Sequence, residues 1–115
     1  MKNKNNSSTD VNLIIYDKLG DVARSRGFIS YSDLGELVGL HGRSRKLSKL
    51  LDDINRYEHQ NKRPMLSAVV ISIVKNSPGR GFFNLAHTLG VYQGHCDLEF
   101  FVNELRKVHD CWSSS

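Results

Sequence analysis

Residues Arg63–Leu89 have the sequence RPMLSAVVISIVKNSPGRGFFNLAHTL, and the rest of the chain is predicted to be organised around them. Residues 65–74 have the Val/Ile-rich composition of a buried strand. Residues 75–81 have the proline and glycine content of an exposed loop. Phe82–Leu89 is an amphipathic stretch that Gly90 would end as a helix. This order predicts a strand, a loop and a helix that packs back on the strand.

Apolar residues recur at three- and four-residue spacing near both ends of the chain, which indicates amphipathic helices. The first helix is predicted to begin near Asp10, with Thr9 or Asp10 as its N-cap. It is predicted to end at Gly27 in the left-handed conformation. The last helix is predicted to be capped by Asp97 and to reach Trp112. We interpret both as packing elements of the scaffold.

Between the first helix and the quoted segment, the pattern predicts a short extended piece at 28–29 and two further helices. The shorter helix is capped by Ser30 or Ser32 and ends at Gly39, and the longer one covers about 44–59. A short helix, a glycine turn and a longer helix with a basic start are typical of a helix-turn-helix. In a winged helix-turn-helix, a basic loop that follows a strand forms the wing.

The length of 115 residues matches one domain, and 39% apolar with 24% charged residues is the composition of a globular protein. The predicted fold class is α+β and mainly helical. It is a winged helix-turn-helix-like domain with a short central strand, a wing and a C-terminal packing helix. Residues 10–112 are assigned to this single domain. Residues 1–9 are predicted to be a disordered tail, and residues 113–115 a second tail.

Positive charge is concentrated in the middle third of the chain. Residues 41–80 contain nine Lys or Arg against three Asp or Glu, whereas residues 1–40 are balanced and 81–115 are acidic. A local basic excess favours a polyanionic partner. A solvated helix face is the alternative interpretation.

The placement of these cations favours nucleic acid. Basic residues at the start of a helix oppose its dipole and typically cost a few tenths of a kcal/mol each. Phosphates or base edges would offset that cost, because the start of the second helix of a helix-turn-helix faces the nucleic acid. The predicted binding residues are those at the start of the longer helix and those flanking the loop: Arg43, Ser44, Arg45, Lys46, Lys49, Lys75 and Arg80. Duplex DNA is the expected partner, with RNA as the alternative.

An enzyme or a metal protein is the third interpretation, and the residue patterns disfavour it. Asp52 and Asp53 are neighbours on a predicted helix and diverge, so they are poorly placed for acid–base catalysis. His109 and Cys111 would lie about 200° apart around a helix, which is unsuitable for zinc. The loop around Gly79 lacks the third glycine and the Gly-Lys-Ser/Thr of phosphate-binding loops. We therefore predict a non-catalytic protein without cofactor or metal.

The expected location is the cytoplasm. The first ten residues lack the apolar stretch of a signal peptide, and no apolar run is long enough to span a membrane, so no membrane partner is expected. Cys96 and Cys111 are then expected to be free thiols. A protein-interaction module, such as a subunit or inhibitor in a bacterial or phage system, is the alternative function. Its contacts would come from Phe82, Phe83 or Trp112.

Two resemblances add to this interpretation. The Arg-Pro, Leu-Ser-Ala and Pro-Gly-x-Gly-Phe-Phe pattern, over about Ile29 to Gly90, resembles a family of small uncharacterised bacterial proteins. More distantly, the same order of elements is similar to the winged-helix DNA-binding domain of the O6-alkylguanine-DNA alkyltransferases and alkyltransferase-like proteins. YSDLG at residues 31–35 falls on their Tyr-Gly-x-Leu-Ala helix, and RKLS at 45–48 on their Arg-Ala-Val-Gly segment.

The second resemblance implies DNA contacts but not alkyl transfer. It implies that Arg45 enters a groove or the duplex, and that Tyr31 contacts a phosphate or a base. The family's Pro-Cys-His-Arg-Val-Val motif would fall on PMLSAVV at 64–70, where neither the cysteine nor the histidine is present. Alkyl transfer needs that thiolate, so this activity is not implied.

Overall fold

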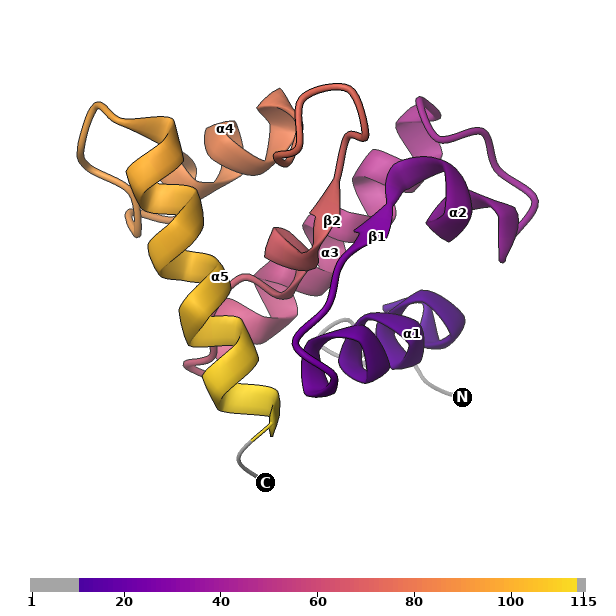
Figure 1. Ribbon diagram of the computed structural model, residues 1–115, viewed down its shortest axis with the longest axis horizontal. Helices are drawn as coiled ribbons and strands as arrows, with labels where there is room; N and C mark the ends of the chain where they lie inside the picture. Colours follow the sequence, from indigo (N-terminus) through magenta and orange to yellow (C-terminus); the bar gives the residue numbers. More distant parts are fainter. Residues whose placement is uncertain (1–10, 114–115) are drawn as a thin grey trace, which may run out of the picture.

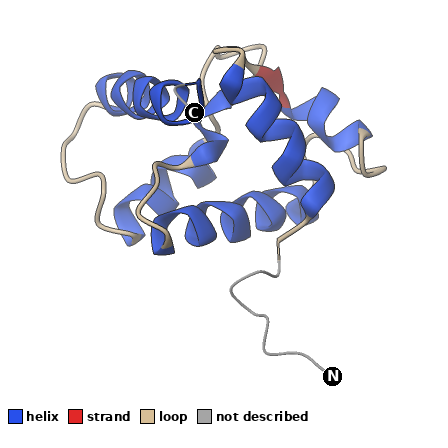
Figure 2. Ribbon diagram, turned by 90° about the horizontal axis from the view of Figure 1, so that it is seen from below, coloured by secondary structure: helices blue, strands red, loops and turns tan. Residues whose placement is uncertain are grey.

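The computed structural model of the protein describes residues 11–113, which form an α+β, mainly helical domain (Figure 1). Figure 2 shows how small the strand content is beside the helices. In chain order the elements are α1 (Leu13–Arg24), β1 (Ile29–Ser30), α2 (Tyr31–Glu36), α3 (Arg45–Gln60), the 3-10 turn η2 (Leu66–Val69), β2 (Val70–Ile71), α4 (Arg80–Thr88) and α5 (Asp97–Ser113). Within residues 11–113, none of the helices has the length and hydropathy needed to cross a membrane.

Residues 65–70 of the quoted segment lie at the centre of the molecule. All side chains from Met65 to Val70 are buried, and α1, α3 and α5 all contact η2 (Figure 1). The two strands are parallel, with Ile29 opposite Val70 and Ser30 opposite Ile71. The chain therefore leaves β1, forms α2 and α3, crosses the core as η2, and returns beside β1.

The prediction of a strand over 65–74 is wrong for most of its length. Leu66–Val69 is a 3-10 turn, and only Val70–Ile71 is extended. Side chains of neighbouring helices satisfy its backbone: the Met65 N–H donates to Glu104 at 2.8 Å and the Ser67 N–H donates to Asn55 at 3.1 Å. Because β1 offers only two residues for pairing, these side chains replace the partners that a longer strand would need.

The first helix begins and ends differently from the prediction. Asn12 is the N-cap of α1 and its side chain accepts a hydrogen bond from the Ile15 N–H at 3.0 Å. The predicted caps, Thr9 and Asp10, lie outside the described residues. At the other end, Arg26 rather than Gly27 has the positive φ of 56°. The prediction from Gly27 thus located the turn correctly but assigned the left-handed conformation one residue too late.

The other helix ends follow the predictions more closely. Ser30 caps α2 and Ser44 caps α3, and Gly39 and Gly90 have positive φ values of 71° and 80° after α2 and α4. Asp97 is the first residue of α5 rather than its cap.

The predicted boundary at the C-terminal end is wrong by one residue. Ser113 belongs to α5, where its hydroxyl donates to the His109 carbonyl at 2.6 Å. Its place in the helix contradicts the tail predicted over 113–115. The predicted tail at 1–9 and the rest of 113–115 lie outside the described residues.

A buried charged cluster joins the end of α3 to α1. The Glu58 side chain is fully buried, and it accepts two hydrogen bonds from Arg63, at 3.0 and 2.8 Å, and one from the Tyr16 hydroxyl at 2.9 Å. Burial, together with the bond to Glu58, raises the pKa of Tyr16 to about 12. The bond to Glu58 also raises the pKa of Arg63. This cluster fixes the chain where it turns from α3 into the central segment.

Gly35 is required by the tight turn after α2. A Cβ there would contact the backbone carbonyl oxygen of Leu40, whose own N–H bonds to the Gly35 carbonyl at 2.9 Å. Helix propensity alone would make Gly35→Ala stabilising by about 1 kcal/mol. We expect the clash to reverse the sign and cost about 1–3 kcal/mol in urea unfolding. The control is Gly81→Ala in α4, where nothing lies within 4 Å of the added Cβ. Equal stability of the two variants would contradict this interpretation.

Candidate functional site

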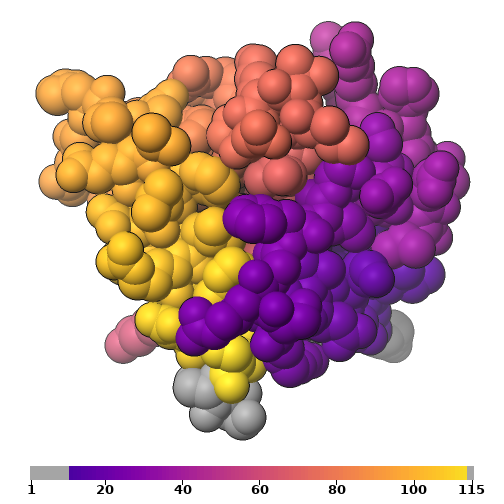
Figure 3. All heavy atoms as spheres, viewed as in Figure 1, coloured from indigo at the N-terminus to yellow at the C-terminus, as the bar shows by residue number. Residues whose placement is uncertain are grey.

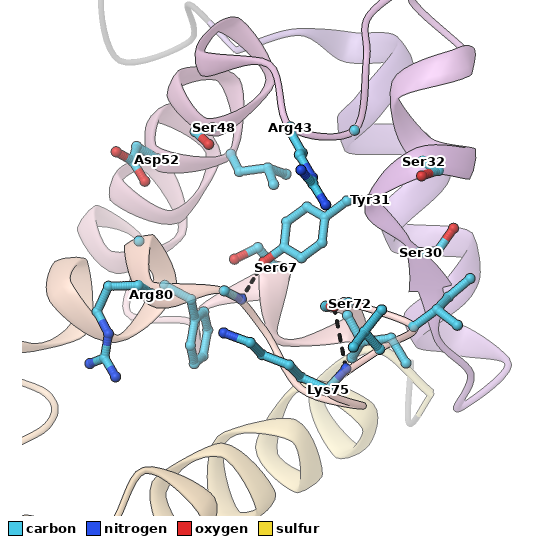
Figure 4. A pocket seen from close by; sticks show the side chains of 18 of the residues that line it. Ser30, Tyr31, Ser32, Arg43, Ser48, Asp52, Ser67, Ser72, Lys75 and Arg80 are labelled. Atoms are coloured by element: carbon cyan, nitrogen blue, oxygen red, sulfur yellow. Dashed lines mark hydrogen bonds between the residues drawn. The ribbon is translucent and has the colours of Figure 1, made fainter.

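An open cavity of about 570 Å³ lies between the start of α2, one face of α3, the loop after β2 and the start of α4 (Figure 4). Its lining combines hydroxyl groups, cations and aliphatic side chains. The polar and charged lining residues are Ser30, Tyr31, Ser32, Arg43, Ser48, Asp52, Asn55, Ser67, Ser72, Lys75 and Arg80. The cavity therefore gathers residues from β1 and α2, the turn before α3, α3 itself, η2, β2 and the loop after it, and α4.

The loop of residues 72–79 forms one wall of the cavity and is held at both ends. The Ser72 N–H donates to the Ser77 carbonyl at 2.9 Å and forms an isolated antiparallel bridge. Asn76 has a positive φ of 56°, which asparagine tolerates better than most residues. At the far end, the Gly79 N–H donates to the Tyr31 hydroxyl at 2.8 Å. The loop is thus a closed turn tied to α2.

Arg43 and Lys75 extend from opposite sides of the cavity, with Tyr31 between them (Figure 4). Both side chains are exposed. Burial raises the pKa of Tyr31, although the bond from Gly79 opposes the shift. Because the Tyr31 oxygen accepts from Gly79, its proton remains available for donation into the cavity.

Arg80 borders the same cavity but points outward (Figure 4). Its guanidinium forms a 3.1 Å ion pair with Asp97 and lies 5.7 Å from the centre of the Phe83 ring. The Tyr92 hydroxyl donates to Asp97 at 2.6 Å, which lowers the pKa of Asp97 and raises that of Tyr92 to about 12. Arg80 is therefore partly neutralised, whereas Arg43 and Lys75 form none of the ion pairs recorded for residues 11–113.

The inner part of the cavity is formed by a buried polar pair. The Asn55 amide donates to the Ser67 hydroxyl at 2.7 Å and accepts from the Ser67 N–H at 3.1 Å. The Ser67 oxygen is occupied as an acceptor, so its proton can be donated to a ligand. Asp52 lies nearby on α3, and burial, with a smaller effect of Asp53, raises its pKa against the opposing effect of Arg56.

The structure brings together four of the eight predicted binding residues. Tyr31, Arg43, Lys75 and Arg80 line the cavity. The four at the start of α3 do not line it: Ser44, Arg45, Lys46 and Lys49. The Ser44 hydroxyl accepts from the Lys46 and Leu47 N–H groups as the cap of α3, and Lys49 pairs with Asp53 at 3.4 Å. Arg45 and Lys46 are exposed on the first turn.

Several residues that line the cavity were not predicted from the sequence. Ser48, Asp52 and Asn55 lie at i, i+4 and i+7 on α3, so they share one face beside its apolar stripe. This polar row was the available signal. Ser67 was hidden in a run interpreted as a strand.

The aromatic residues predicted as protein contacts are not free surface groups. Phe82 and Phe83 are each only 5% exposed, and their rings lie 5.2 Å apart. Phe100 and Tyr92 complete the same aromatic cluster. Trp112 is half-buried, with its ring edge-on to Tyr16 at 5.8 Å and under the Arg24 guanidinium at 5.3 Å. Both phenylalanines are therefore core residues.

The cavity offers hydrogen-bond donors and cations. Tyr31, Ser67, Arg43 and Lys75 can all donate hydrogen bonds, and Asp52 is the one carboxylate among the lining residues. Within residues 11–113, no three His, Cys, Asp or Glu side chains are grouped so that they could hold a metal ion. Such a lining suits an anionic, oxygen-rich ligand. Comparisons of the chain with protein-family models, curated proteins and solved structures gave no match.

Proposed function

We propose that this protein binds nucleic acid, with duplex DNA as the partner. The contacts are made by the mouth of the cavity, where the exposed side chains of Arg43 and Lys75 lie, and by the first turn of α3. The binding is non-catalytic. One observation carries the proposal: Arg43 and Lys75, from segments far apart in the sequence, line the same open cavity, with Tyr31 between them. Cations and hydroxyl donors are the groups that contact phosphate oxygens in protein–DNA complexes.

The order of elements supports a helix-turn-helix interpretation of this surface. On this proposal α2 and α3 are its two helices, α3 is the recognition helix, and the loop of residues 72–79 acts as the wing. Arg45 and Lys46, exposed on the first turn of α3, add two cations that follow the cavity residue Arg43 closely in the sequence. The resemblance to the DNA-binding domain of the alkyltransferases points to the same residues, Tyr31 and Arg45.

A salt series with labelled duplex, single-stranded DNA and RNA hairpins tests the proposal. Four of the predicted binding cations form none of the ion pairs recorded for residues 11–113: Arg43, Arg45, Lys46 and Lys75. If these four meet phosphates, duplex affinity should fall with a log–log slope of about −3.6, since each contact contributes about −0.9. Absence of duplex binding at low salt would contradict the proposal. A salt-resistant protein complex free of nucleic acid would instead support the protein-interaction alternative.

Asp52 is expected to weaken this binding, because its carboxylate lies in a cavity that otherwise attracts anions. Two phosphates at about 8 Å would repel it by about 1 kcal/mol in total at the dielectric constant of water. Asp52→Asn should therefore bind duplex DNA about fivefold more tightly. The measurement is fluorescence anisotropy at low salt. The control is Asp17→Asn, which changes an exposed carboxylate on α1 outside the cavity.

Wild type and Asp52→Asn should also differ in how their affinity for duplex DNA depends on pH. Burial raises the pKa of Asp52, so this carboxylate takes up its proton at a higher pH than a fully exposed aspartate does. As the pH falls through this pKa, wild-type Asp52 loses its charge and its repulsion of phosphates. Wild type should therefore gain affinity that Asp52→Asn already has, and the two binding curves should converge. Parallel curves over the whole pH range would exclude this role for Asp52.

A further inference from the structure

The tip of the 72–77 turn is apolar although it borders a basic cavity. Ile73 is 71% exposed and Val74 is 91% exposed, and both line the cavity with Arg43 and Lys75. In Figure 3 the atoms of this part of the chain lie at the surface at the top of the molecule, between the atoms of α4 and those of α2 and α3. The fold gains little from these two side chains, because aliphatic groups stabilise a fold when they are removed from water.

The shape of the turn is fixed without them. The turn is closed by the Ser72–Ser77 bridge, by the bond from the Asn76 N–H to the Ser72 carbonyl at 2.7 Å, and by the bond from the Lys75 N–H to the Ser72 hydroxyl at 3.4 Å. These bonds use the backbone and the Ser72 side chain. The tip is therefore a preorganised projection that presents two aliphatic side chains next to a lysine.

We propose that Ile73 and Val74 form a wedge that enters between base steps of the bound duplex and partly unstacks them. This inference rests on the proposed DNA binding. Proteins that kink DNA insert apolar side chains between base steps, while neighbouring cations hold the phosphates. Here Lys75 follows the wedge directly, and Arg43 lies on the opposite side of the cavity.

The wedge predicts a preference that phosphate contacts alone would not produce. Pyrimidine–purine steps such as TpA unstack most easily, so a wedge should favour duplexes rich in them over A-tracts of the same length. Phosphate contacts carry no sequence information directly. A protein that only tracks the backbone would therefore show much less discrimination between these duplexes.

The experiment uses a short duplex with several TpA steps and 2-aminopurine, a base whose fluorescence rises when it unstacks. Wild type should increase the fluorescence on binding. The Ile73→Ser/Val74→Ser variant should bind with the same salt slope but lose the increase. The control is Leu13→Ser/Ile14→Ser, which changes two adjacent side chains on α1 that are 65% and 59% exposed. It should behave as wild type.

The outcomes separate the wedge from the binding proposal. If wild type binds the duplex and the fluorescence does not change, or changes equally in the Ile73→Ser/Val74→Ser variant, the wedge is overturned and DNA binding stands. The exposed tip would then serve another partner, such as a protein. If wild type does not bind the duplex at low salt, both proposals fall.

Discussion

Glu58→Ala is expected to lower the free energy of unfolding by about 3 kcal/mol, the lower end for removing one partner of a buried ion pair. The Glu58 side chain is fully buried, and its removal leaves Arg63 and the Tyr16 hydroxyl without their acceptor. Arg63 is one-third exposed, so water offsets part of the loss. Urea unfolding measures the change.

The matched control is Glu36→Ala, which removes an exposed glutamate from α2 and should change stability by less than about 0.5 kcal/mol. An unfolding free energy of Glu58→Ala within that margin of wild type would contradict the structural role of the cluster.

The same cluster predicts a difference between wild type and Tyr16→Phe at alkaline pH. The pKa of Tyr16 is raised from 10.0 to about 12 in the folded protein, so folding favours its protonated form. This contribution is fully present below pH 10 and is lost as the pH rises towards 12. Wild type should therefore lose more stability than Tyr16→Phe over that interval. Equal losses of stability would show that the Tyr16 phenol has the same pKa in the folded and the unfolded protein.

Arg43→Ala/Lys75→Ala is expected to have the largest effect on binding. If each side chain meets one phosphate, the salt slope should decrease by about 2. Because the variant no longer releases the counterions of these two contacts, its affinity for the duplex should be about 60-fold lower at 0.1 M salt. Both side chains are exposed and form none of the ion pairs recorded for residues 11–113, so the fold should be unaffected.

The control for this variant is Arg106→Ala/Lys107→Ala, which removes the same charge from the exposed face of α5. It should keep the wild-type salt slope, because a contact that is not made releases no counterions. Equal slopes for the two double variants would show that net charge, and not the cavity, determines binding.

Most of the helices could be predicted from the sequence because their signals are local. Ser30 caps α2 and Gly90 follows α4 where the patterns placed them. The central segment could not be predicted, because the composition of a short, buried Val/Ile-rich run does not show whether the run forms a strand or a helical turn. The backbone N–H groups of Ser67 and Met65 bond to Asn55 on α3 and Glu104 on α5, which are 12 and 39 residues away in the sequence, and no local pattern identifies these partners.

The candidate site was predictable only in part. Charge clustering selected Arg43 and Lys75, and the structure places both at one cavity. Nothing local in the sequence shows that Arg80 turns outward to Asp97, since that pair joins two different helices. The wedge residues were hidden for a similar reason: Ile73 and Val74 continue an apolar run, and only the fold shows that the chain leaves the core before them.

The central claim is that duplex DNA contacts the mouth of the cavity, and an NMR titration of isotope-labelled protein tests it most directly. Adding a short duplex should shift the backbone amide signals of Arg43, Lys75 and Gly79–Gly81, and leave those of the exposed face of α5 unchanged. Shifts confined to α5, or no shifts at low salt, would contradict the claim.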